Sequence, residues 1–297
     1  MTETLHLACG GSAEYLRHIA AMVASAADHA GALALHVHCM HEPSLARRDR
    51  VRFERFVAGL GASVTLIEVD DSVIAGLPPV RHLKRPMWYR CFLPQLAPDL
   101  GTVLYLDADT LAADVLEPLW TTDLDGNAIG AVTNVWEPWN APYEKSLGLA
   151  KPYFNSGVML MDLERLRGQR ATQAIVDYAL AHLDRLPWGD QDPLNVVLGE
   201  GRLELHPRWN CMNSVLYFDE AVAVFGAEAV AEARARPGIR HFEGPSINKP
   251  WHYLCRWDGR DDYYRYRART PWPRVRRAGV TPRNIARRVT RSLRVSA

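Results

Sequence analysis

Cysteine is scarce and scattered in this chain of 297 residues. The five cysteines are Cys9, Cys39, Cys91, Cys211 and Cys255, an odd number without a C-x-x-C pair. This pattern argues against a disulfide framework and against a zinc knuckle, so we expect reduced thiols.

Long apolar runs are also missing. The first eleven residues include Glu3 and His6 and lack a basic start, and the longest small-apolar stretch, 19–27, is too short to cross a bilayer. We therefore expect a cytoplasmic protein that is neither secreted nor transmembrane.

Acidic residues are absent after Asp262, whereas the same segment contains eleven arginines. Because the whole chain has a net charge of +1, the preceding part carries about −10. We expect a folded domain at 1–262 and a basic, aromatic-containing tail at 263–297. In this tail, Ile285, Val289 and Leu293 have helical spacing among arginines, which predicts an amphipathic helix that lies on an anionic membrane surface. The alternatives are a solvated tail or a contact with nucleic acid, and we do not favour nucleic acid as a partner.

Strands and helices alternate in the first third of the chain. A helix over 14–27 and a second helix capped by Ser44 separate three short β-type runs. The expected strands are 5–9, 33–39 and 64–69. This order predicts an α/β fold with a doubly wound, mostly parallel sheet, helices on both faces, and a ligand crevice at the carboxyl ends of the strands.

The strongest single signal is the stretch Thr-Val-Leu-Tyr-Leu-Asp-Ala-Asp-Thr, which spans residues 102–110. A β-branched, apolar run that ends at Asp107 and Asp109 predicts a buried strand with two carboxylates at its carboxyl end. Residues two apart in an extended chain face the same side, so both carboxylates can share one divalent cation. The alternative is an ordinary strand end followed by an Asx turn.

Further polar residues accompany later strands. Asn155 and Ser156 precede a buried strand, and the small residues there suit close approach of the backbone to a ligand. His241 ends another strand and is a metal donor if it faces two carboxylates. Arg90, near the start of a helix, faces either an anionic ligand or solvent.

Two further segments combine structural and functional signals. In the segment 188–195, we expect Asp192 to cap a helix with Pro193 in its first position, which leaves Asp190 and Gln191 for chemistry. The irregular segment 135–154 contains aromatic residues that either pack locally or hold the apolar faces of sugars. These are Trp136, Trp139, Tyr143 and Tyr153.

Four motifs in one order resemble the family 8 retaining glycosyltransferases, which include bacterial lipopolysaccharide galactosyltransferases and glycogenin. The motifs are Asp107-Ala108-Asp109, Phe154-Asn155-Ser156-Gly157-Val158, Asp190-Gln191-Asp192, and His241-x-x-Gly244 followed by Lys249-Pro250-Trp251. The resemblance implies a GT-A fold and transfer of a hexose from a nucleotide sugar, most simply UDP-galactose or UDP-glucose. It implies a glycan or glycolipid acceptor, such as the lipopolysaccharide core, and a bound Mn²⁺ that Mg²⁺ can replace.

The resemblance also assigns residues. The implied metal ligands are Asp107, Asp109 and His241, and the implied catalytic residues are Asp190 and Gln191. The implied donor contacts are Ala8, Ser12, Arg90, Asp107, Asn134, Asn155, Ser156, Gly244 and Lys249. Retention allows a covalent intermediate or a front-face attack; Asp190 is the stronger nucleophile, and the Gln191 oxygen is suited to stabilising a cationic sugar.

Three features depart from the family pattern. Gly10 and Gly11 replace the acid that helps to recognise uracil, and Asn134 stands where a relative carries Asp near the sugar. The loop between Gly244 and Lys249 is longer than the common form. A nucleotide-sugar-binding protein without transfer activity is therefore the alternative function. A haloacid-type phosphatase fits less well, because its motif needs another residue between the second Asp and the Thr.

Overall fold

The computed structural model describes residues 3–77, 85–135, 141–274 and 277–295, with the backbone alone for residue 141 and residues 289–295. Its helices are α1 (Leu16–Asp28), α2 (Arg47–Gly59), α3 (Tyr89–Leu96), α4 (Glu117–Trp120), α5 (Ala141–Ser146), α6 (Leu163–Gly168), α7 (Ala171–Ala181), α8 (Gln191–Leu198), α9 (Asn213–Tyr217), α10 (Glu220–Phe225), α11 (Ala227–Ala235), α12 (Arg260–Arg269) and α13 (Pro282–Val295). The short 3-10 turns are η1 (Arg85–Trp88), η3 (Leu183–Arg185), η4 (Pro207–Asn210) and η5 (Ser246–Asn248).

A mixed sheet of seven strands, in the order β3-β2-β1-β4-β7-β6-β8, forms the centre of the described chain. Its strands are β1 (Thr4–Gly11), β2 (Ala34–His41), β3 (Ser63–Glu68), β4 (Thr102–Leu106), β6 (Ile129–Thr133), β7 (Phe154–Asp162) and β8 (Arg202–Glu204). Strand β7 runs antiparallel to both β4 and β6, whereas the other neighbours are parallel. The expected α/β fold is confirmed, with one reversed strand inserted in the sheet.

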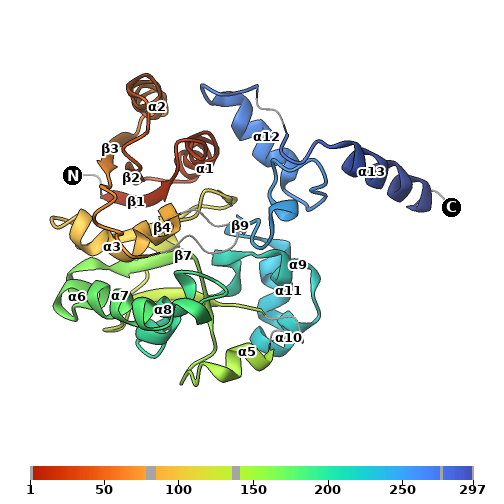
Figure 1. Ribbon diagram of the computed structural model, residues 1–297. Helices are drawn as coiled ribbons and strands as arrows, with labels where there is room; N and C mark the ends of the chain where they lie inside the picture. Colours follow the sequence, from red (N-terminus) through yellow and green to blue (C-terminus); the bar gives the residue numbers. More distant parts are fainter. Residues whose placement is uncertain (1–2, 78–84, 136–140, 275–276, 296–297) are drawn as a thin grey trace.

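Helices cover both faces of the sheet because alternate strand residues enter different apolar clusters. Leu7 packs in the cluster that includes residues of α1 and α2, whereas the adjacent Ala8 packs in the cluster that includes residues of α3, α7 and α8. Helices α6, α7 and α8 accordingly lie across the sheet from α1 and α2 (Figure 1).

The reversed direction of β7 determines which residues surround the end of β4. Leu106 pairs with Val158, so the beginning of β7 lies beside the last residues of β4. The backbone N–H of Asp107 donates to the carbonyl of Gly157 at 2.8 Å. Asn155, Ser156 and Gly157 therefore reach the carboxyl edge of β4, although they lie at the beginning of their own strand.

A second, two-stranded sheet brings a distant segment to the same edge. Strands β5 (Thr110–Ala112) and β9 (Ile239–His241) pair antiparallel, with Thr110 opposite His241. The N–H of Phe242 donates to the carbonyl of Asp109 at 3.0 Å. This pairing places His241 next to the two acids that follow β4.

One expected helix start is wrong. Helix α2 begins at Arg47, and the residue before it, Ala46, is extended and contributes no side-chain cap. Ser44 lies further upstream and does not cap the helix. In the segment 135–154, α5 forms, while Trp136 and Trp139 lie outside the described residues.

The carboxyl-terminal segment consists of two dissimilar helices. The expected boundary between Asp262 and Tyr263 falls inside α12, where Tyr263 is buried and its hydroxyl lies 2.6 Å from Nδ1 of His18 on α1. Helix α13 instead projects outward (Figure 1), and its Arg288 donates to the carbonyl of Tyr253 at 2.8 Å. Among the described residues, neither of these helices nor any other is both long and apolar enough to span a membrane.

Candidate functional site

The residues Asp107, Asp109 and His241 meet at the carboxyl end of β4. One ligand atom from each lies within 4.8 Å of the other two. The imidazole Nε2 of His241 is 3.6 Å from Oδ1 of Asp109, and the Asp107 side chain is about one-quarter exposed, which leaves it open to a ligand. Two carboxylates and an imidazole form a donor set for a divalent cation.

Lys249 balances the buried carboxylate of Asp109. Its ammonium forms an ion pair with Oδ2 of Asp109 and donates to the carbonyl of Phe242 at 3.1 Å. Burial alone raises the pKa of Asp109, but Lys249 and His241 reverse this effect and hold the pKa well below its usual range. Burial likewise lowers the pKa of Lys249, and Asp109 overrides it, so the pKa rises. The pair is therefore charged at neutral pH.

A chain of amides orients His241. Its Nδ1 lies 2.8 Å from Oδ1 of Asn210, and Nδ2 of Asn210 donates to Oδ1 of Asn155 at 3.0 Å. Since this second bond fixes the amide of Asn210 with its oxygen toward the ring, Nδ1 of His241 donates to that oxygen, and Nε2 is the ring nitrogen that faces the acids. Asn210, on η4, was not among the residues that sequence patterns indicated.

Gly157 makes room for the three metal-type ligands. A Cβ at this position would lie 2.4 Å from Cε1 of His241 and 2.8 Å from Oδ2 of Asp107. Any side chain would therefore push the imidazole and the carboxylate apart. The lack of a side chain at Gly157 and the direction of Nε2 of His241 toward the acids both fit a cation held by Asp107, Asp109 and His241.

Arg90 connects this metal-type cluster to a further carboxylate, that of Asp190. The buried guanidinium is 3.1 Å from Oδ1 of Asp107 and 2.7 Å from Oδ2 of Asp190, and it donates to the carbonyl of Ser156 at 2.7 Å. Burial alone lowers the pKa of Arg90, but Asp107 and Asp190 raise it well above its usual value. The predicted arginine thus faces acidic side chains rather than solvent.

Asp190 is buried at the start of α8. Burial raises the pKa of this carboxyl to about 7, Arg90 opposes the rise, and Asp107 adds to it. Gln191, the next residue, accepts through Oε1 from the N–H of Ser156 at 2.9 Å and from its hydroxyl at 3.2 Å. Both catalytic candidates therefore lie beside Ser156 and Arg90.

The expected capping role of Asp192 is wrong. Asp190 occupies the position before α8, without a side-chain cap. Asp192 is fully buried and accepts instead from the hydroxyl of Tyr153 at 2.7 Å and from the N–H of Trp188 at 2.9 Å. Tyr153 therefore packs locally rather than over a sugar.

The other predicted donor contacts differ in their surroundings. Ala8 is buried beneath the site, in register with Tyr105, and Ser12 has a buried hydroxyl without a hydrogen-bond partner in the described part of the chain. Gly244 follows β9 with a φ of +86°, which favours glycine. Asn134 is partly buried, and its N–H donates to the carbonyl of Tyr153 at 2.7 Å.

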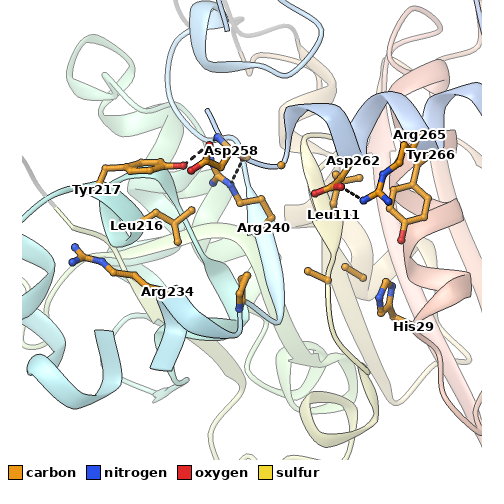
Figure 2. Close-up of a pocket in the computed structure, with 14 residues that line it drawn as sticks. His29, Leu111, Leu216, Tyr217, Arg234, Arg240, Asp258, Asp262, Arg265 and Tyr266 are labelled. Carbon is orange, nitrogen blue, oxygen red and sulfur yellow. Dashed lines mark hydrogen bonds and ion pairs between the residues drawn. The ribbon is translucent and has the colours of Figure 1, made fainter. Parts of the chain in front are cut away.

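A separate cavity of about 430 Å³ lies between α12 and α9, and none of the predicted site residues line it (Figure 2). Leu111 and Arg240, which line it, are strand neighbours of Thr110 and His241, so they face away from the acids. The Arg240 guanidinium donates to the carbonyl of Cys211 at 2.9 Å and also contacts Asn213. This arginine is therefore tied to the cavity wall.

The raised pKa of Asp190 predicts a pH-dependent stability difference. The folded pKa of about 7 exceeds the unfolded value, so the proton on Asp190 stabilises the folded state. This stabilisation is complete below the unfolded pKa and is lost as pH rises through 7. Asp190→Asn removes this dependence. We expect the unfolding free energy of the variant, relative to the unmodified chain, to rise by about 2–3 kcal/mol between pH 5 and pH 8. Urea unfolding at both pH values measures this difference.

The matched control is Asp184→Asn, because the Asp184 side chain is 81% exposed. Its free-energy difference from the unmodified chain should be the same at both pH values. A difference for Asp190→Asn that also stays constant with pH would contradict the raised pKa.

Comparison with known proteins assigns the chain to a family. The profile of Glycosyl transferase family 8 matches residues 6–255. General stress protein A of Bacillus subtilis (strain 168) is 28% identical over 278 residues, which cover 91% of this chain and 95% of that protein. Lipopolysaccharide 1,2-glucosyltransferase of Escherichia coli (strain K12) is 29% identical over 156 residues, which cover 51% of this chain and 46% of that protein.

Structural comparison agrees on the fold. The galactosyltransferase LgtC, solved with donor and acceptor sugar analogs, has a TM-score of 0.80 and 23% identity to this chain, covering 90% of it and 96% of LgtC. This likeness shows the GT-A-type fold. Because the family profile covers most of the sequence, the chain belongs to glycosyltransferase family 8.

Proposed function

We propose that this glycosyltransferase moves a hexose from UDP-galactose or UDP-glucose to a glycan acceptor such as the lipopolysaccharide core, with retention of configuration. The observation that carries the proposal is the meeting of Asp107, Asp109 and His241 at one strand edge, next to Arg90 and Asp190. Similarity to a lipopolysaccharide glucosyltransferase supports the class of acceptor. The sugar analogs bound to LgtC support a donor and an acceptor site in this fold.

The proposed cofactor is Mn²⁺, with Mg²⁺ as a substitute. The two carboxylates of Asp107 and Asp109 favour both ions. Asp107, Asp109 and His241 would hold the ion, which when bound supplies a Lewis acid for a diphosphate leaving group.

Lys249 is the proposed diphosphate contact. Its ammonium forms an ion pair with Asp109, at the edge of the metal-type cluster, and stays protonated there. A fixed cation at this place stabilises the negative charge that grows on the β-phosphate as the bond to the sugar breaks. Gly244, with a φ of +86°, allows the turn that follows β9 and precedes Lys249.

The proposed sugar subsite lies on the other side of Asp107. Arg90 is held by Asp107 and Asp190, and Gln191 is held by Ser156, so these groups are pre-positioned. If the intermediate is covalent, Asp190 is the nucleophile, because a carboxylate is a stronger nucleophile than an amide. In a front-face attack, the Gln191 oxygen stabilises the cationic sugar. Asn134 and Asn155 complete the proposed set of donor contacts.

Metal dependence tests the proposed activity. Asp109→Asn removes one charged ligand, and we expect a loss of about a hundredfold or more in donor hydrolysis, as for removal of other principal electrostatic groups. A mass-spectrometric screen of UDP-sugars with Mn²⁺ or with a chelator measures turnover. Asp184→Asn, with its exposed side chain, is the control that should keep full activity.

Two outcomes would count against the proposal. Full turnover by Asp109→Asn in chelator would show that the metal-site assignment is wrong. Binding of a UDP-sugar without turnover, with every acceptor tried, would favour a nucleotide-sugar-binding protein instead.

Base recognition should be loose. Gly10 and Gly11 offer no side-chain hydrogen bond to uracil. The buried hydroxyl of Ser12 replaces the missing acid with at most a weak, uncharged hydrogen bond. We expect UDP, GDP and ADP to inhibit turnover with constants less than about a hundredfold apart, a gap of roughly 2.7 kcal/mol. Ser12→Ala should reduce the difference between the three inhibition constants further. A larger preference for UDP would reveal a uracil contact from another element.

Helix α13 is the proposed contact with the inner face of a membrane. Ile285 is exposed, and Arg283, Arg287 and Arg288 are close to it in the sequence. The structure describes only the backbone of Val289, Arg291, Leu293 and Arg294. Deleting residues 282–297 should abolish co-sedimentation with anionic vesicles and leave the thermal midpoint unchanged, because α12 remains. Neutral vesicles and added salt are the controls. Binding that survives the deletion, or that salt does not weaken, would contradict the proposal.

A further inference from the structure

Three histidines gather on one face of the sheet, away from the proposed catalytic groups. His6 on β1 is in register with His36 on β2, and His38 follows two residues later on the same face. Nδ1 of His6 lies 3.0 Å from Nε2 of His38, and the rings of His36 and His38 stack at 4.4 Å. One nitrogen from each ring lies within 4.8 Å of the other two.

The location separates this histidine cluster (His6, His36 and His38) from the acids of the candidate site. The three residues belong to the first five positions of β1 and β2, whereas Asp107 follows the carboxyl end of β4. Ala8 and Tyr105, which are paired across β1 and β4, lie between the two groups. The cluster is also accessible, because His6 and His36 are only partly buried.

The rings are held in the form that binds metals. Burial, together with the neighbouring His36 and His6, lowers the pKa of His38 to about 4. Burial also lowers the pKa values of His6 and His36. All three imidazoles are therefore neutral at pH 7, and protons do not compete with a metal for their lone pairs.

We propose that His6, His36 and His38 form a second metal site, which takes Zn²⁺ or a similar borderline divalent ion through three imidazole nitrogens. Tetrahedral zinc with bonds of 2.0–2.1 Å places its ligand nitrogens about 3.3 Å apart, close to the 3.0 Å between Nδ1 of His6 and Nε2 of His38. The ring of His36 stacks parallel to that of His38, so it must turn to direct a nitrogen at the same ion. The Thr65 hydroxyl on β3 lies 2.8 Å from Nε2 of His36, so Nδ1 is the nitrogen that this ring offers to the ion.

The two sites differ in the ion that they select. The histidine cluster, as defined by its described ligand atoms, has three imidazoles and no carboxylate, whereas the site at Asp107 and Asp109 has two carboxylates. Imidazole favours zinc, copper and nickel, and carboxylate favours manganese and magnesium. Three protein ligands leave a fourth zinc position open to water or to a ligand from outside.

The test measures Zn²⁺ binding in a background that lacks the acidic site. The tag-free chain carrying Asp109→Asn is dialysed against Zn²⁺ in the presence of excess Mg²⁺, and bound zinc is counted. We expect one Zn²⁺ per chain and an increase in the thermal midpoint. Adding His36→Gln or His38→Gln should weaken binding about tenfold or more and remove the increase. His182→Gln is the matched control, because His182 is partly exposed on another element and lies outside the cluster.

The possible results distinguish zinc bound at the histidine cluster from zinc bound at the acidic site. Loss of zinc in the His36 and His38 variants, with retention in the His182 variant, supports the second site. Zinc that binds the unmodified chain but not the Asp109→Asn chain belongs to the acidic site and overturns the proposal. No bound zinc, or zinc retained in the His36 variant, overturns it as well. His36 is partly exposed, so its variant decides the test if replacement of the buried His38 prevents folding.

Discussion

Charge compensation at low dielectric is the constraint on which the site depends. Three carboxylates, Asp107, Asp109 and Asp190, lie close together where water is largely excluded, and like charges there are costly. Arg90 bridges two of them, and Lys249 neutralises the third. Arg90 comes from α3, the helix directly before β4, whereas Lys249 comes from a segment far from β4 in sequence. The acids therefore become tolerable only when both α3 and the loop after β9 are in place. Even so, the burial of Asp190 outweighs the effect of Arg90, so the pKa of this carboxyl rises.

Local sequence patterns predicted the residues at strand ends well. Asp107, Asp109 and His241 terminate apolar runs, and a buried strand must place its next residue at the sheet edge. The patterns could not predict the direction of β7, because this strand is buried along nearly its whole length and so reads as the continuous apolar run that is typical of a parallel strand. Yet this direction brings Asn155 and Gly157 to the carboxyl end of β4. The nearness of these residues to the acids is therefore a property of the topology.

Two other features were beyond sequence reasoning because they depend on tertiary contacts. The capping rule assigned Asp192 to the helix end, but Tyr153 and Trp188 supply stronger partners for its buried carboxylate. Asn210 belongs to a short 3-10 turn without any sequence signal, and its role arises from the position of its amide between His241 and Asn155. In both cases a polar group is buried, and burial makes its hydrogen-bond partner decisive.

Helix α12 has a consequence for how the chain acquires its site during synthesis. Tyr263 contacts His18, and the ring of His18 stacks on Trp251 at 3.6 Å, two residues after Lys249. The loop that carries Lys249 is thus clamped between the first helix and one of the last. A ribosome releases α1 well before α12, so in a nascent chain Asp109 lacks its partner Lys249 until the segment after β9 has emerged. Synthesis of that segment is therefore the step that completes the charge balance at the end of β4.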